Sequence, residues 1–228
     1  ALSKHGIIDA DASDTQAMRR AVAFCQVIEP RNEAKAHRVS SKQIAAMFQT
    51  VVEAYNEKES ELDDPLVCEA EHVDGSMNAT EKEEKLNWLK QGSEGNTCRI
   101  LSNVRCLSEG VDVPSLDAVL FLTPRNSQVD VVQSVGRVMR NAPGKERGYV
   151  ILPVVIPAGM EPSEALNDNK VYKVVWEVLQ ALRSHDDKFD AMINKLELIG
   201  SDPQKMEVIA VSDTVPSKPS VALTAQEK

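Results

Sequence analysis

The sequence predicts an α/β fold: a parallel sheet flanked by helices and followed by a C-terminal helical extension. Short apolar runs alternate with amphipathic helical patterns over residues 20–156, which is typical of βαβ units in a parallel sheet covered on both faces. After Pro157 the helical patterns continue without further strand-like runs. The 228 residues are 42% hydrophobic and 27% charged, a composition typical of a folded globular chain and not of a disordered one.

Five apolar runs are expected to form the strands. The first covers residues 20–28 (RAVAFCQVI), and it is short and continuous, as buried strands are. The polar, basic stretch 29–39 that follows is expected to be a loop. The other four strands are expected at 66–73, 97–103, 116–122 and 148–156.

The helices are expected from apolar periodicity and from capping residues. In residues 44–55 apolar side chains recur at helical spacing, and either Ser40 or Ser41 is suited to cap that helix. The pattern Thr80-x-x-Glu83 fits a capping box at the start of the next helix. The remaining helices are expected at 80–90, 127–140, 167–183 and 186–198. The helix 127–140 has Ser127-x-x-Asp130 at its start.

The chain is expected to divide into four parts. Residues 211–228 contain two prolines and no periodicity, which indicates a flexible tail. The chain does not begin with Met, so we expect it to be a piece of a longer protein. The expected parts are a linker at 1–19, a domain at 20–156, a helical extension at 157–200 and the tail at 201–228.

Charge and cysteine content limit the possible functions. The net charge of −9 argues against a domain that holds nucleic acid by basic charge alone. That acidity is local, because residues 57–94 carry 4 − 12 = −8 whereas residues 99–147 carry 7 − 5 = +2. The four cysteines form no C-x-x-C pair and the four histidines have no metal spacing, so we expect no metal site and a cytoplasmic protein. No apolar run approaches the roughly 18 residues of a membrane span.

One helix is expected to carry a polar stripe. On a helical wheel of residues 127–140, the valines fall on one side. The opposite side holds Gln133, Gly136, Arg137 and Arg140. Two guanidinium groups beside a residue without a side chain suit close approach of a phosphate group. A solvated helix face is the alternative reading of the same stripe.

A second polar constellation follows the expected strand 97–103. In an open α/β sheet, ligands bind at the carboxyl ends of the strands. Ser102 and Asn103 offer neutral donors to phosphates there, Gly110 allows a left-handed turn, and Asp112 can accept from a ribose hydroxyl. An ordinary connector, with Ser and Asn capping a short helix, explains the segment equally well.

Together the two constellations resemble superfamily 2 (DEAD/DEAH-like) helicases. The sequence QSVGRVMR at 133–140 matches their motif VI, Q-x-x-G-R-x-x-R, and residues 102–114 match motif V, with Ser102 in place of the usual Thr. Residues 20–26 lie where motif IV belongs, and residues 72–77 (HVDGSM) resemble a further turn of the family. Residues 98–145 look most like the predicted helicases of restriction systems, the type ISP enzymes, which are related to type I and type III restriction translocases.

The resemblance implies a second RecA-like motor domain of an ATP-dependent DNA helicase or translocase of a restriction–modification enzyme. Its cofactors would be ATP and Mg²⁺, and its partner DNA. By similarity, the catalytic arginine fingers would be Arg137 and Arg140. The ATP-binding residues would be Gln133, Gly136, Gly110 and Asp112, and the residues that bind nucleic acid would be Ser102, Asn103, Arg105 and Gly75.

Half of the ATP site is missing from this sequence. The phosphate-binding pattern G-x-x-x-x-G-K-[ST] is absent, the only Gly-Lys pair being Gly144-Lys145, and so is a D-E-x-H run. The Mg²⁺ ligands are therefore expected in an N-terminal RecA-like domain of the same polypeptide, and this chain alone is expected to be inactive. A non-catalytic module that kept the fold and binds nucleic acid or a partner is the alternative.

Overall fold

A computed structural model describes residues 17–25, 40–58, 64–91, 95–103, 116–140, 142, 143, 145 and 147–183. Four predictions concern residues outside these ranges. They are the strand end at 26–28, the loop 29–39, the helix at 186–198 and the tail. Of the described helices, none combines the length and the apolar character needed to cross a bilayer.

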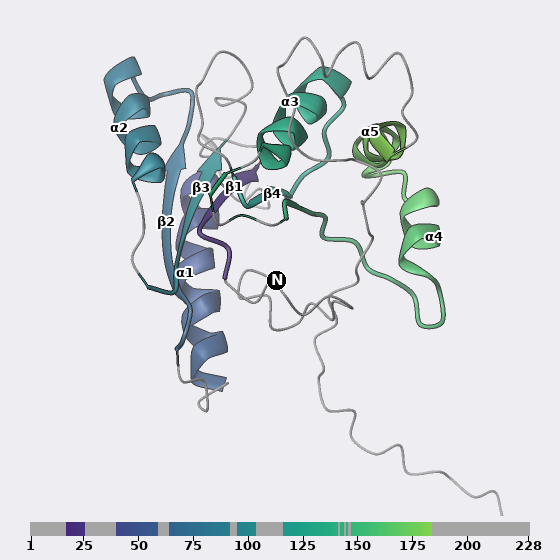
Figure 1. The fold of residues 1–228 in the computed structure, drawn as a ribbon, viewed down its shortest axis with the longest axis horizontal. Helices are drawn as coiled ribbons and strands as arrows, with labels where there is room; N and C mark the ends of the chain where they lie inside the picture. The colour runs from purple at the N-terminus through teal and green to yellow at the C-terminus, as the bar shows by residue number, and fades with distance from the viewer. Residues whose placement is uncertain are drawn as a thin grey trace, which may run out of the picture.

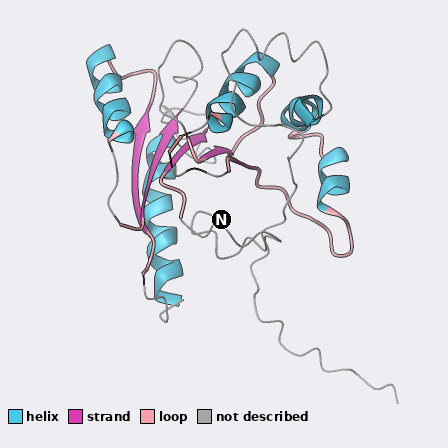
Figure 2. Cartoon of the chain, in the orientation of Figure 1, coloured by secondary structure: helices cyan, strands magenta, loops and turns pink. Residues whose placement is uncertain are grey.

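Five parallel strands form one sheet in the order β2-β3-β1-β4-β5. Every neighbouring pair in it is parallel, which confirms the predicted α/β class. Figure 2 shows the strands lying between helices. The strands are β1 (Arg20–Phe24), β2 (Val67–Val73), β3 (Thr97–Asn103), β4 (Ala118–Phe121) and β5 (Tyr149–Ile151).

Helices cover both faces of the sheet (Figure 1). Alternate strand residues point to opposite faces. Val22 belongs to the core beneath α2, α3 and α5, whereas Ala21 and Ala23 belong to the core beneath α1. The helices are α1 (Ser41–Lys58), α2 (Ala79–Lys90), α3 (Gln128–Met139), α4 (Pro162–Asn167) and α5 (Lys173–Arg183).

The helix starts follow from side-chain caps. The Ser40 hydroxyl accepts from the Gln43 amide at 3.2 Å and the Gln43 side chain accepts from the Ser40 amide at 2.9 Å, so Ser40 is the cap of α1. The capping box of α2 is formed by Asn78 and Glu81, and the predicted box at Thr80 and Glu83 is wrong. Asn78 has extended backbone angles directly before the first helical residue, and Thr80 already lies within the helix.

Arginines on two neighbouring strands cap the other end of α2. Arg20 and Arg99 are register partners in β1 and β3. The Arg20 guanidinium donates to the carbonyls of Leu89 and Lys90 at 3.1 and 3.2 Å. Cations are favourable at a helix C-terminus, where the carbonyl groups lack helical partners. The pair therefore fixes the end of α2 to the amino edge of the sheet.

Two elements are shorter than the sequence predicts. β5 ends at Ile151, whereas the strand was expected to continue to 156. Within the described residues it pairs only with β4. Pro153 lies just beyond its end and has no amide hydrogen to donate to a strand ladder. The expected helix 167–183 begins only at Lys173, as α5, and the separate short helix α4 ends at Asn167. The Asn169 side chain accepts from the Val171 and Tyr172 amides in the break between them.

The helix α5 packs into the same hydrophobic core as the sheet and α3. Val175, Val178 and Leu182 of α5 pack in the same cluster as the valines of α3. Trp176 is buried there too, and its indole donates to the Asn167 side chain at 2.7 Å. α5 thus covers α3 on a side that the sheet does not reach.

Candidate functional site

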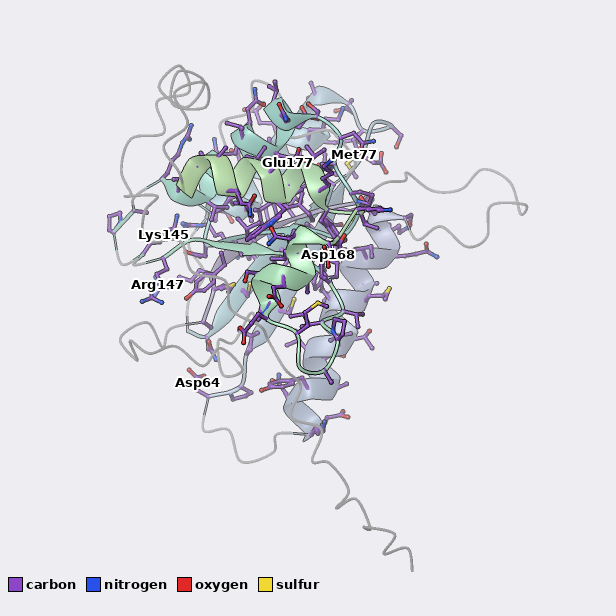
Figure 3. All side chains as sticks on the ribbon, turned by 90° about the vertical axis from the view of Figure 1, so that its right-hand side faces the viewer. Asp64, Met77, Lys145, Arg147, Asp168 and Glu177 are labelled. Carbon is purple, nitrogen blue, oxygen red and sulfur yellow. The ribbon has the colours of Figure 1, made fainter. Side chains whose placement is uncertain are left out.

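The predicted site residues separate to the two ends of the sheet. α3 follows β4 and runs back to the start of β5, so it begins at the carboxyl edge and ends at the amino edge. Figure 3 makes the separation visible: Asp64, Lys145 and Arg147, which precede strands, lie on one side, and Met77, which follows β2, lies on the other. Arg137 and Arg140 therefore belong to the amino edge, and Gly75 and Asn103 to the carboxyl edge.

The polar stripe of α3 is only partly exposed. Gly136 is buried and Arg137 is 9% exposed, so these two residues are covered although the wheel places them opposite the valines. Packing of α5 against α3 adds a second covered side to the helix. Gln133 and Arg140 are half-buried. Within the described residues, the Gln133 Oε1 atom is buried without a hydrogen-bond partner.

Arg140 is placed where α3 ends. It is the C-cap residue, with φ −61° and ψ 132°, so the chain leaves the helix at this position. Its half-buried guanidinium makes no hydrogen bond or ion pair within the part of the chain that the structure describes. Its five donors are arranged as a planar fork, the geometry that suits a phosphate group.

The carbonyl groups at the end of α3 are held from two directions. The Leu116 amide, just before β4, donates to the Arg137 carbonyl at 3.4 Å. The Lys145 ammonium donates to the Val138 carbonyl and, at 2.8 Å, to the Arg140 carbonyl. Burial lowers the pKa of Lys145 to about 8, and the charge of Asp117 opposes that shift. Sequence reasoning considered Lys145 only as part of a phosphate-binding pattern.

Asn103 ends β3 at the carboxyl edge. Its side chain is fully buried, and neither its Oδ1 nor its Nδ2 atom has a hydrogen-bond partner among the described residues. A buried amide without partners is rare and costs about 1–3 kcal/mol. This amide therefore has the hydrogen-bonding capacity that a ligand contact requires.

Ser102 faces the opposite side of the sheet. Its hydroxyl is buried and donates to the Ser41 carbonyl at 2.6 Å, at the start of α1. A second carbonyl, that of Glu71, lies at 3.3 Å. In this structure the hydroxyl connects β3 to α1, and its predicted contact with nucleic acid stays a prediction.

Gly75 is exposed in a turn that its neighbours order. The buried Asp74 carboxylate accepts from the Ser76 amide at 2.8 Å and from the Ser76 hydroxyl at 2.5 Å. Burial raises the pKa of Asp74, but the hydrogen bonds from Ser76 outweigh it and the net pKa lies below its usual range. The turn directly precedes the cap of α2.

Sequence reasoning missed one arginine at this edge. The Arg125 guanidinium lies over the Phe24 ring, 4.6 Å from its centroid, and Phe24 stacks on Phe121 at 5.4 Å. The signal that could have found Arg125 is its position, four residues after the last residue of β4. Arg105, Gly110 and Asp112 lie outside the described residues, so their predicted roles stay predictions.

Comparisons with known proteins identify the family of this chain. Residues 15–142, more than half of the chain, match the family described as helicase conserved C-terminal domain. The chain belongs to this helicase family. It is 32% identical over 82 residues to a putative helicase of Sulfolobus islandicus filamentous virus, and 40% identical over 57 residues to a probable helicase of African swine fever virus. Those matches cover 36% and 25% of this chain.

A solved structure supports the same assignment. The ATP-dependent type ISP restriction–modification enzyme LlaBIII, bound to DNA, superposes over 89% of this chain with a TM-score of 0.61 and 41% identity. The chain spans 12% of that enzyme's chain, and 14% and 7% of the two viral helicases. The resemblance to superfamily 2 helicases and to restriction-system helicases is confirmed, and the fold is RecA-like.

Proposed function

We propose that this helicase C-terminal domain is the second motor half of an ATP-dependent DNA translocase or helicase of a restriction–modification enzyme. Arg140 carries the proposal, because a half-buried guanidinium without a partner among the described residues ends α3 at the position of the last motif VI arginine. The identity of 41% to a DNA-bound type ISP enzyme supports the choice of DNA and of the restriction class.

The residues at the amino edge are suited to contact a nucleoside triphosphate that is bound by a second domain. Arg140 offers its fork and Arg137 a second permanent charge, and Gln133 has an unused acceptor. ATP bound with Mg²⁺ would supply the phosphoryl group, with the Mg²⁺ ligands contributed by the first RecA-like domain of the same polypeptide. Arg140 and Arg137 would stabilise the negative charge that develops in transfer to water, which accounts for a factor of roughly 10³–10⁵ in rate where such fingers have been removed.

The carboxyl edge fits a nucleic-acid backbone. Asn103 has buried donors and acceptors without partners among the described residues, and the exposed Gly75 lets a backbone approach closely. Neutral donors of this kind position a strand without requiring a basic surface. That is consistent with a net charge of −9.

The test compares this chain with the full-length polypeptide that contains it. We expect ATP hydrolysis by this chain, with or without DNA, to remain at background. In the full-length protein Arg140→Ala should lower kcat at least 10³-fold, with Lys173→Ala, an exposed lysine of α5, as the matched control. Wild-type turnover in Arg140→Ala would refute the finger assignment. DNA binding by a full-length protein that hydrolyses no ATP would indicate the non-catalytic alternative.

A further inference from the structure

The segment that leads into β5 makes close contact with the last turn of α3. Lys145 donates to the Val138 and Arg140 carbonyls. Gly148 passes so near that an added Cβ would collide with the Val138 carbonyl and side chain. The two contacts are independent, one a hydrogen-bonded cation and the other a steric approach. Both converge on the backbone between the two arginines of motif VI.

A helix end of this kind needs donors from elsewhere. The last four carbonyls of a helix have no helical partner. At the end of α3, the Leu116 amide serves the Arg137 carbonyl, and Lys145 serves those of Val138 and Arg140. One side chain thus holds two carbonyls, and the second of them belongs to Arg140 itself.

Lys145 occupies this position although burial disfavours its charge. Its pKa is lowered to about 8 by burial, with Asp117 at the start of β4 as the opposing negative charge. Arg137, Arg140 and Arg147, which belong to the same edge, are cations as well. A lysine that only improved solubility would extend into water. This one turns inward and donates to the Val138 and Arg140 carbonyls at the helix end.

We propose that Lys145 is a positioning residue for the arginine fingers, because it fixes the backbone from which Arg140 departs. This inference rests on the proposed function. Lys145 acts through the Val138 and Arg140 carbonyls and does not itself contact the phosphate. Without it, the last turn of α3 keeps only the Leu116 contact among the donors described here, and the Arg140 guanidinium loses its fixed origin. Misplacement of a catalytic group by about 1 Å can cost on the order of 10²-fold in rate.

The experiment measures steady-state ATP hydrolysis by the full-length polypeptide with saturating DNA. Lys145→Met should lower kcat roughly 10- to 100-fold and leave the KM for ATP within about two-fold. Lys145→Arg, which keeps a permanent charge and several donors, should recover most of the lost rate. Lys173→Met in α5 removes an exposed lysine and should have no effect.

A double-mutant cycle separates positioning from the other roles that a lysine could have. If Lys145 acts through Arg140, Lys145→Met should lower kcat by less than about two-fold in an Arg140→Ala background. Independent, multiplying losses would overturn the proposal, since they are expected if Lys145 contacts the phosphate or only supports the fold.

The two proposals fail in different ways. If Arg140→Ala retains wild-type turnover, the proposed function itself is refuted. If Arg140→Ala is inactive but Lys145→Met has wild-type kcat, only the positioning role is refuted. Should the Lys145→Met protein not fold, Lys145→Gln, which keeps an N–H donor and loses the charge, takes its place. We then expect a loss of about 3- to 10-fold in kcat, and an unchanged kcat overturns the proposal.

Discussion

Replacing Arg99 by Met should destabilise the chain because one side chain holds three parts of the structure together. Its Nε donates to Glu69 of β2 at 2.7 Å. Its Nη1 donates to the Trp88 and Gln91 carbonyls at the end of α2, at 2.8 and 3.1 Å. The guanidinium also lies 5.3 Å from the centroid of the Trp88 ring. The Arg99 side chain is 15% exposed, so water replaces these contacts poorly.

The expected loss can be worked out contact by contact. Each hydrogen bond to a helix-end carbonyl contributes about 1 kcal/mol net. The cation–π contact adds about 0.5–1 kcal/mol. The ion pair adds about 0.5 kcal/mol at most, because the Glu69 side chain is 44% exposed and solvent screens it. The sum is about 3 kcal/mol, which corresponds to a shift of about 1 M in the urea midpoint for a slope of about 2–3 kcal/mol per M.

Equilibrium unfolding in urea, followed by circular dichroism, measures this shift. Lys173→Met is the matched control, because its exposed i,i+4 contact with Glu177 at 3.6 Å contributes at most about 0.5 kcal/mol. Arg99→Lys keeps the charge but not the fork, and it should fall between the two. If the urea midpoint of Arg99→Met lies within about 0.2 M of the wild-type midpoint, a shift on the order of the control's, the account of how α2 is fixed is refuted.

Three further predictions concern the amino edge and the buried thiols. Asp117→Ala leaves the Arg19 and Arg20 amides, both 2.9 Å from its carboxylate, without that acceptor, so urea unfolding should show a loss of about 2–3 kcal/mol. Asp117→Asn, which keeps an acceptor, should lose about half as much. In Gly148→Ala the added Cβ pushes against the Val138 backbone, so the free energy of unfolding in the same assay should fall by about 1–3 kcal/mol. An unchanged free energy of unfolding would show that the segment before β5 does not approach α3 so closely. Burial raises the pKa of Cys25 and of Cys68 to about 11, so less thiolate is present in the folded chain. At pH 8 their alkylation, located by mass spectrometry, should be roughly 100-fold slower than in guanidinium chloride, and equal rates would contradict their burial.

The sequence predicted the central strands well because their signal is local. Residues 97–103 form β3 with both ends as predicted, and its apolar residues Cys98, Ile100 and Leu101 are fully buried in the sheet. The edge strand β5 was extended too far, because the apolar run continues after the partner strand has ended. The capping box of α2 was placed two residues late, as Asn78 and Thr80 both precede an acidic residue at the right spacing and only the end of β2 decides between them.

The packing of the candidate site residues could not be predicted from the sequence. The motif residues Arg137 and Arg140 were identified, yet a helical wheel of one helix does not show that Gly136 and Arg137 are buried in the folded chain. Lys145 could not be found from sequence, because its partners are backbone carbonyls, and backbone carbonyls have no residue type that a motif could specify. Adjacent strand residues point to opposite faces, so the predicted strand separates Ser102 from Asn103. The sequence does not show that the Ser102 hydroxyl is hydrogen-bonded and the Asn103 amide is not.

The position of α3 explains how one short helix can serve both edges of the sheet. Its 12 residues span about 18 Å. Ser127 caps its start at the carboxyl edge, and Lys145 holds its end at the amino edge. Between them Val131, Val135 and Val138 are buried against the sheet and α5. A close-packed helix of this kind moves as a rigid body unless those contacts break. A displacement of the Ser127 end of α3 would therefore move the Arg140 end as well, and we expect the hydrogen bonds from Lys145 to determine how closely the last turn follows.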